Sequence, residues 1–159
     1  MSGIIQNPHY VFDAGPLIDL KYYPREIFPS LWENLQKMAD SGQIISCSEV
    51  FREVSESGDE ASQWAEQNRK IFKRPSLGEQ EIIQKILLKH PELIRKRNRL
   101  AGRAVADPFV LSCAKFHGIT LVHAELYKAN AHGIANVCEE LAIKNISLKD
   151  FFLENGWRF

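Results

Sequence analysis

Acidic residues at four places in the chain are the strongest candidates for chemistry. They are Asp13, the pair Glu49 and Glu53, Asp107, and Glu125. Burying one carboxylate is costly unless something compensates its charge, and several converging carboxylates repel one another. A hard divalent cation such as Mg²⁺ or Mn²⁺ removes that repulsion, because it prefers oxygen ligands. If these side chains meet, they predict metal-assisted hydrolysis of a phosphate ester.

Each acid also has a purely structural alternative. Asp107 precedes Pro108, so it could cap a helix whose first residue is the proline. Asp13 lies before an Ala-Gly-Pro sequence and could be a turn residue. Glu49 and Glu53 are spaced to share one helical face and could both be solvated there. Only convergence of the acids would favour the metal interpretation over these alternatives.

Short apolar strands alternating with amphipathic helices would have to position these acids. We expect strands at residues 10–12, 44–45, 120–122 and 145–146. We expect helices at 16–22, 29–39, 59–72, 78–89, 91–100, 134–141 and 147–154, with one more through Val50 and Val54 and another from Asp107 to Gly118. This alternation predicts an α/β fold with three α/β/α layers and a short central parallel sheet, in a single domain over residues 1–159.

The expected strands bring the acids toward one edge of that sheet. In open parallel sheets, ligands bind outside the carboxyl ends of the strands. Asp13 directly follows the first strand, and Glu125 lies three residues beyond Val122 at the end of a later one. Glu53 lies on the helix after the second strand, and a loop could bring Asp107 to the same edge.

The overall composition is that of a globular domain. The chain has 159 residues, 45% of them hydrophobic and 25% charged, which is enough apolar material for one core. No apolar run approaches the about 18–20 residues that span a bilayer. The first nine residues lack the layout of a signal peptide, so we expect a cytoplasmic protein with no membrane partner.

The three cysteines, Cys47, Cys113 and Cys138, are widely separated and include no C-x-x-C pair. This spacing suggests neither a disulfide framework nor a sulfur-ligated zinc site. We expect all three to be small buried apolar residues.

Four short segments, spread over the chain, each contain candidate acids. They are VFDAGPLI at 11–18, SCSEVFREV at 46–54, ADPFV at 106–110 and LVHAE at 121–125. Together they resemble the four ordered motifs of PIN-domain ribonucleases, and the resemblance extends over residues 10–159. The basic segment before the third motif and the Gly-Trp-Arg-Phe ending at 156–159 are similar to one poorly characterised prokaryotic branch of that family.

The fourth segment departs from the family pattern at two positions. His123 stands where Thr or Ser is usual, and Glu125 stands where Asp is common. Glutamate is longer than aspartate, so Glu125 could act through a water molecule. His123 could be a bystander, an RNA contact or a metal ligand.

The resemblance implies a metal-dependent endoribonuclease that hydrolyses RNA phosphodiester bonds with Mg²⁺ (or Mn²⁺). The implied catalytic and metal-binding residues are Asp13, Glu53, Asp107 and Glu125, with Glu49 in reserve. Many prokaryotic relatives are VapC-like toxins of type II toxin–antitoxin pairs, so an antitoxin protein is an expected partner beside RNA. A homodimer remains open. The alternative is a non-catalytic scaffold on the same fold that binds RNA or protein.

The charge distribution suggests where RNA would be held. Net charge is zero, yet residues 69–103 contain eleven Lys and Arg against three acids, so this stretch carries +8 and the remainder −8. An acidic pocket repels RNA, which makes the basic stretch the candidate for phosphate contacts. The predicted RNA-binding residues are Arg95, Lys96, Arg97, Arg99 and Arg103. The alternative is a solvated basic helix. Trp157 and Phe159 could stack on a base or pack on the domain.

Overall fold

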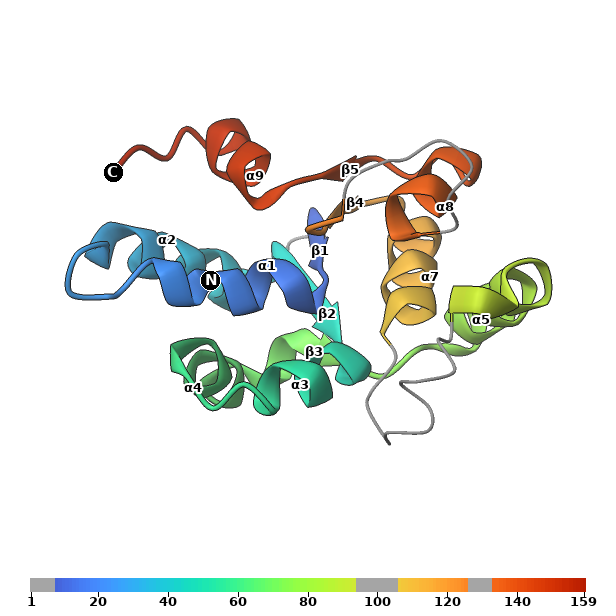
Figure 1. Cartoon of the computed structure of the whole chain (residues 1–159), viewed down its shortest axis with the longest axis horizontal. Helices are drawn as coiled ribbons and strands as arrows, with labels where there is room; N and C mark the ends of the chain where they lie inside the picture. Colours follow the sequence, from blue (N-terminus) through green and yellow to red (C-terminus); the bar gives the residue numbers. More distant parts are fainter. Residues whose placement is uncertain (1–7, 94–105, 126–132) are drawn as a thin grey trace.

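The computed structural model describes residues 8–93, 106–125 and 133–159. Five strands form an all-parallel sheet in the order β3-β2-β1-β4-β5 (Figure 1). The strands are β1 (Tyr10–Phe12), β2 (Ile44–Cys47), β3 (Phe72–Lys73), β4 (Thr120–Val122) and β5 (Asn145–Ile146). In the register of the central strand, Tyr10 pairs with Ile44 on one side and with Thr120 on the other.

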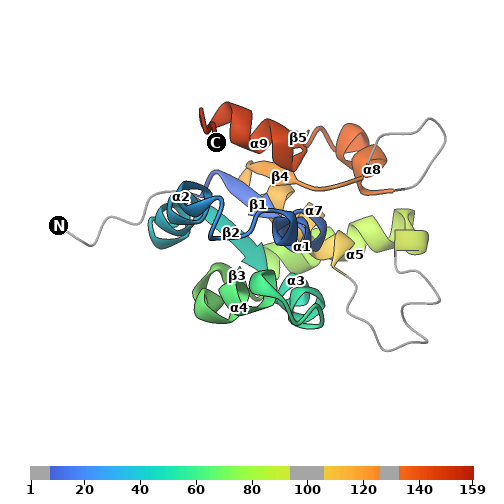
Figure 2. The same ribbon diagram turned by 60° about the vertical axis from the view of Figure 1, so that its left-hand side comes forward.

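Helices cover both faces of this sheet, so the expected α/β/α architecture is confirmed. Figures 1 and 2 show α1 and α2 on one side of the strands and α5 and α7 on the other. The helical elements are α1 (Ala14–Asp19), η1 (Leu20–Tyr22), α2 (Pro29–Asp40), α3 (Ser48–Ser55), α4 (Glu60–Gln67), η2 (Arg69–Ile71), α5 (Leu77–Lys89), η3 (Pro91–Leu93), α7 (Asp107–His117), α8 (Ile134–Glu140) and α9 (Leu148–Glu154).

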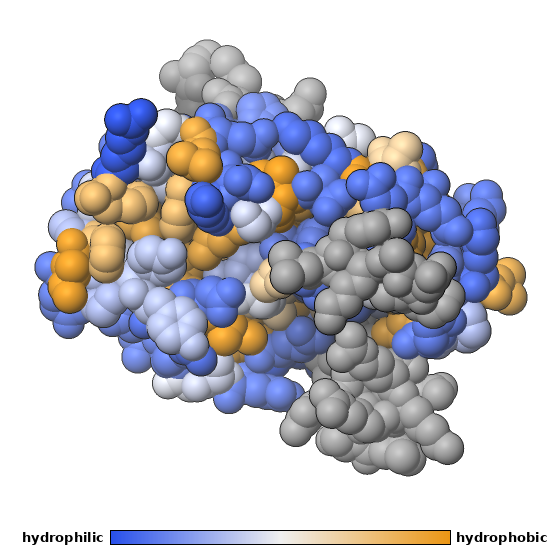
Figure 3. Space-filling model, turned by 45° about the horizontal axis from the view of Figure 1, so that its top comes forward, coloured by the Kyte–Doolittle hydropathy of each residue, from blue (hydrophilic) through white to orange (hydrophobic). Residues whose placement is uncertain are grey.

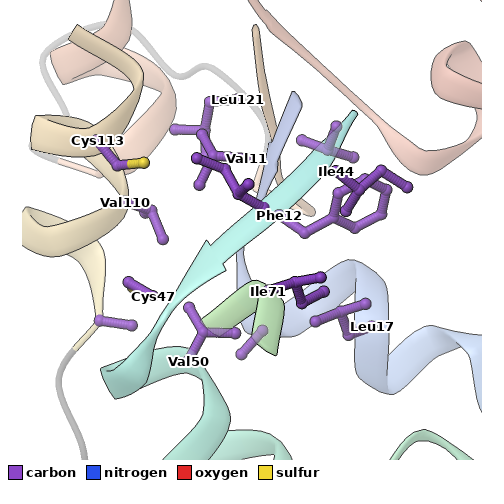
Figure 4. Close-up of a cluster of buried hydrophobic side chains, with 14 of the residues drawn as sticks. Val11, Phe12, Leu17, Ile44, Cys47, Val50, Ile71, Val110, Cys113 and Leu121 are labelled. Carbon is purple, nitrogen blue, oxygen red and sulfur yellow. The ribbon is translucent and has the colours of Figure 1, made fainter. Parts of the chain in front are cut away.

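The central strand is apolar because both of its faces are buried. Val11 and Phe12 are fully buried, and their side chains point to opposite faces of the sheet. Figure 4 shows Val11 beside Leu121 on the side of α7, and Phe12 beside Ile44 on the other side. Phe12 also meets the ring of Phe151 on α9 edge to face, with 4.9 Å between centroids. This packing fixes the end of β1, where the first candidate acid follows.

The fifth strand is a correction to the expected elements. We expected one helix over 59–72, whereas α4 ends at Gln67 and Phe72 begins β3, which pairs with β2. Asn68 ends α4: its backbone leaves the helical region (φ −121°, ψ 34°), and its side-chain amide donates to the Trp64 carbonyl oxygen at 2.8 Å. A strand of two residues is too short to show an alternating pattern. Of the helix expected at 91–100, the described part is the 3₁₀ turn Pro91–Leu93.

The C-terminal aromatic residues pack on the domain, which was one of the two expected alternatives. The ring of Trp157 stacks on Phe152 of α9 with centroids 5.8 Å apart. Phe159 meets Phe28 edge to face with centroids 6.0 Å apart. The end of the chain is therefore held against the start of α2 by aromatic contacts.

The surface and the cysteines agree with the composition. On the face shown in Figure 3, hydrophobic side chains form small groups among hydrophilic ones. In the part of the chain that the structure describes, no helix combines the length and the apolar character needed to cross a membrane. All three cysteines are free and buried, as expected.

Candidate active site

The strand order defines where a ligand would bind. From β1 the chain builds outward to β2 and β3, and then returns to place β4 on the other side of β1. Such a reversal leaves a crevice at the carboxyl ends of the two strands that flank it, here β1 and β4. Asp13 follows β1, and its backbone N–H donates to the carbonyl oxygen of Val122, the last residue of β4, at 3.0 Å. The first candidate acid therefore lies at the reversal point.

Asp13 is a buried carboxylate in an acidic environment. It precedes α1 in an extended conformation (φ −77°, ψ 170°) and is 8% exposed. Burial raises the pKa of Asp13 to about 7; a hydrogen bond from the Ala14 N–H opposes this rise, and the charges of Glu53 and Glu125 add to it. The electrostatic influence of these two glutamates indicates that all three carboxylates share one region.

Glu53 lies at the same edge and connects two elements. Its Oε1 accepts a hydrogen bond of 3.2 Å from the backbone N–H of Ala106, the residue before α7. Burial raises the pKa of Glu53 to about 7, and the charge of Asp107 raises it further. Glu49, in contrast, forms a 3.2 Å ion pair with Arg52, whose side chain is exposed. Of the two glutamates on α3, Glu53 is the one tied to the other acids.

Asp107 is the first residue of α7. Ala106 occupies the capping position, so the alternative in which Asp107 is the N-cap differs from what the structure shows. The helix ends at Gly118, which adopts a left-handed conformation (φ 64°) before the chain enters β4. Because α7 returns the chain to the amino end of β4, its own first turn lies toward the carboxyl edge of the sheet.

Glu125 is held by the start of α8. Its Oε1 accepts a hydrogen bond of 3.2 Å from the Ile134 N–H. Gly133 permits this contact, because a Cβ atom there would lie 2.5 Å from Glu125 Oε1. Negative charge at a helix start is also favoured by the helix dipole.

His123 uses both ring nitrogens inside the protein and is 4% exposed. Nδ1 accepts a hydrogen bond of 3.1 Å from the Glu125 N–H, and Nε2 lies 2.8 Å from Asn145 Oδ1 on β5. With Nδ1 accepting, Nε2 carries the hydrogen and donates it to Asn145. His123 therefore acts on the backbone that carries Glu125, which matches the bystander alternative and adds a positioning role.

The supporting groups were not predicted from the sequence. Gly133, Asn145 and the Ala106 N–H act through contacts between distant segments, and no short motif marks them. Gly15, inside the first motif, gave a signal: a Cβ there would lie 3.0 Å from the Cβ of Ala124, so the first and fourth motifs pack tightly.

The acids suit a hard divalent cation by their chemistry. Among the described residues, no Lys or Arg forms an ion pair with Asp13, Glu53 or Glu125, so their negative charge lacks a cationic partner there. All the donors are carboxylate oxygens, the type that Mg²⁺ and Mn²⁺ prefer. In the same described part of the chain, no three of these acids place oxygens within 4.8 Å of one another. Mg²⁺ bound here would keep several of its waters, as it usually does in proteins.

The predicted RNA-binding residues lie outside the described part of the chain. They are Arg95, Lys96, Arg97, Arg99 and Arg103. The described chain resumes at Ala106, which contacts Glu53. The basic segment thus joins the fold directly at the acidic edge.

The fold and this site define an α/β protein with an acidic centre at the carboxyl edge of a parallel sheet. Residues 10–159 match the family model described as "Domain of unknown function (DUF4411)", and the chain belongs to that family. The match spans all the candidate acids and the C-terminal ending. A comparison with curated proteins gave no match.

Proposed function

We propose that this chain is a metal-dependent endoribonuclease of the PIN-domain type, with Asp13, Glu53, Asp107 and Glu125 as the residues that hold Mg²⁺ or Mn²⁺. One observation carries the proposal: acids from four distant segments gather at the strand-order reversal. Asp13 and Glu53 are each influenced by other members of the set. Their shared negative charge is the feature that a divalent cation would neutralise.

The roles of the protein groups follow from their contacts. When bound, the ion would supply an activated water and neutralise charge on the scissile phosphate. The chain keeps the ligand oxygens in place: Ala106 fixes Glu53, and Ile134 fixes Glu125. The hydrogen bond from Asp13 to Val122 joins the ends of β1 and β4, so the two strands cannot separate without moving an acid. This preorganisation reduces the rearrangement that catalysis requires.

The biological part of the proposal rests on the family resemblance. The chain would be the toxin of a type II toxin–antitoxin pair, acting on RNA in the cytoplasm and inhibited by an antitoxin protein. Basic residues 95–103 would contact the RNA backbone, because the acidic edge itself repels phosphate. The competing proposal is a non-catalytic scaffold that binds RNA or protein through the same surfaces.

A cleavage assay tests the proposal directly. The purified full chain is incubated with a mixed RNA pool and, separately, with a DNA pool, in Mg²⁺, in Mn²⁺ or in EDTA. We expect metal-dependent cleavage of RNA that EDTA and Asp13→Asn abolish. Asp150→Asn is the matched control, since Asp150 is an exposed residue of α9, and it should cut normally. Metal-independent RNA binding without cleavage would favour the scaffold, and cleavage of DNA alone would overturn the substrate class.

A further inference from the structure

A second group of metal-ligating side chains lies between α5 and α7. Glu79, Cys113 and His117 bring a carboxylate oxygen, a sulfur and an imidazole nitrogen within 4.8 Å of one another. Cys113 and His117 are one turn apart on α7, and Glu79 is in the first turn of α5. None of the three belongs to the acidic edge.

Two of these side chains are fixed by the surrounding structure. Glu79 is 6% exposed and closes a capping box in which its Oε2 accepts from the Ser76 N–H at 2.7 Å. That bond leaves Oε1 directed at His117, whose Nε2 is 3.2 Å away. Cys113 is 4% exposed and projects from α7 toward the strands (Figure 4). The donor atoms therefore converge without a rearrangement of the backbone.

A close approach of the two helices holds this arrangement together. A Cβ atom at Gly78 would lie 2.3 Å from the ring of Phe116 on α7, so only glycine allows α5 to begin so near. Gly78 precedes Glu79, and Phe116 precedes His117. The contact places the donors opposite one another.

The cluster is accessible from a cavity. All three side chains line a cavity of about 330 Å³ that also borders Cys47 and Arg74. The side chain of His117 is 37% exposed, which opens the cluster toward solvent. An ion could reach the donors, and the cavity leaves room for a water molecule beside them.

We propose that Glu79, Cys113 and His117 form a site for a borderline transition-metal ion, best suited to Zn²⁺, with the fourth position open toward the cavity. Thiolate, imidazole and carboxylate are the standard zinc ligands, and three of them with one water complete a tetrahedron. The sulfur and nitrogen donors disfavour Mg²⁺ and Ca²⁺. On binding, the Cys113 thiol gives its proton to solvent as the sulfur–metal bond forms.

Without an ion, the same residues form hydrogen bonds that are fully explained by helix capping and by the Glu79–His117 contact. The proposal differs from that structural role in one respect: the ion would link α5 to α7. Because α7 begins at Asp107, this link would brace the helix that carries one of the candidate catalytic acids. The zinc site does not depend on the proposed nuclease activity.

Cobalt binding tests the site with a sulfur-specific signal. The full chain, stripped of metal, is titrated with Co²⁺ as a spectroscopic substitute for Zn²⁺. We expect one equivalent to bind with a sulfur-to-cobalt charge-transfer absorption that Zn²⁺ removes. The absorption should vanish in Cys113→Ser and weaken strongly in His117→Gln, and Zn²⁺ should raise the melting temperature of the wild type but not of these variants.

Matched variants separate this site from its neighbours. Cys138→Ser replaces another buried cysteine, and Cys47→Ser replaces a thiol on the same cavity; both should keep the absorption. Asp13→Asn should keep it as well, which distinguishes this site from the acidic edge. The proposal is overturned if the wild type shows no charge-transfer absorption, or if the absorption survives Cys113→Ser. His117→Gln alters a partly exposed side chain, so it remains informative if the cysteine variant fails to fold.

Discussion

The backbone N–H of Ala106 donates a 3.2 Å hydrogen bond to Oε1 of Glu53. The two residues are 53 positions apart in the sequence, yet this bond joins α3 to the first turn of α7. Through it, the glutamate that follows β2 is held beside Asp107, whose charge raises the pKa of Glu53. The acidic edge is thus a connected structure, and changes at its members have distinguishable consequences.

The first prediction concerns the two glutamates of α3. Glu53→Gln should lower RNA cleavage by more than the roughly 10–100-fold that losing a group that only orients a metal ligand costs. Glu49→Gln should have a much smaller effect, because Glu49 pairs with Arg52 at the surface. Single-turnover rates of both variants measure this, with Glu33→Gln, an exposed position on α2, as the control. An inactive Glu49→Gln beside an active Glu53→Gln would reverse the assignment.

The same substitution should leave the protein folded. Replacing Glu53 by Gln removes one of several mutually repelling charges and keeps the side chain's oxygen as an acceptor for Ala106. The melting temperature of metal-free Glu53→Gln should therefore equal or exceed that of the wild type at neutral pH. A marked loss of stability would mean that the carboxylate serves the fold rather than a metal.

The second prediction concerns pH and metal binding. The pKa of Asp13 and that of Glu53 rise to about 7 from ordinary values of 3.8 and 4.5. The folded protein therefore retains protons that the unfolded chain has released, and their stabilising contribution is complete below the ordinary values and lost as pH rises through about 7. Metal-free protein should melt at a higher temperature at about pH 5 than at about pH 8 as far as these groups contribute.

Metal should reverse this trend, because it binds the deprotonated carboxylates. Saturating Mg²⁺ should raise the melting temperature clearly at about pH 8 and little at about pH 5, since an ion at a hundredfold excess over its dissociation constant contributes about 2.7 kcal/mol. Asp13→Asn should lose most of the Mg²⁺ effect, whereas Asp150→Asn should keep it. An equal Mg²⁺ effect at both pH values would contradict the assignment of the ion to these residues.

The third prediction uses Gly133. A Cβ atom at this position would lie 2.5 Å from Glu125 Oε1, so Gly133→Ala must displace that carboxylate. The backbone there (φ −80°) suits alanine, and the displaced group is the end of a flexible side chain, so stability should change little. Activity should fall toward that of Glu125→Gln. The double variant should be no worse than Glu125→Gln alone, and fully additive losses would place the effect of Gly133 elsewhere.

The sequence predicted the acids well because each stands beside a strongly apolar segment. The fully buried Val11 and Phe12 lead directly to Asp13, and the fully buried Leu121 and Val122 precede the loop that carries Glu125. Short apolar strands between helices leave few arrangements other than a parallel sheet, whose carboxyl edge gathers whatever follows the strands.

The features that the sequence did not predict depend on contacts between distant segments. β3 has two residues and exists as a strand only because β2 lies beside it. The role of His123 is set by Asn145, which is 22 positions away. Glu79, Cys113 and His117 converge because two helices pack closely, and the Cys-x-x-x-His spacing on one helix is a weak signal without the third residue.

The last prediction concerns the basic residues that precede Ala106 in the chain. If Arg95, Lys96, Arg97 and Arg99 hold the RNA backbone, their combined replacement by Gln should weaken binding to all sequences alike. Each lost phosphate contact releases fewer counterions, so the slope of log affinity against log salt should fall by roughly 0.7–0.9 per contact. Fluorescence anisotropy with an uncleavable RNA across a salt series measures this.

An acidic antitoxin on the same segment would give a different result. The variant would then lose its partner yet cut RNA at the wild-type rate, which a pull-down and a cleavage assay distinguish. Metal binding at the acidic edge should survive in either case, since the four replaced residues provide no carboxylate. An unchanged salt slope together with unchanged partner affinity would contradict both roles and leave the segment as solvated surface, because a basic stretch that binds RNA cannot lose its charges without losing salt dependence.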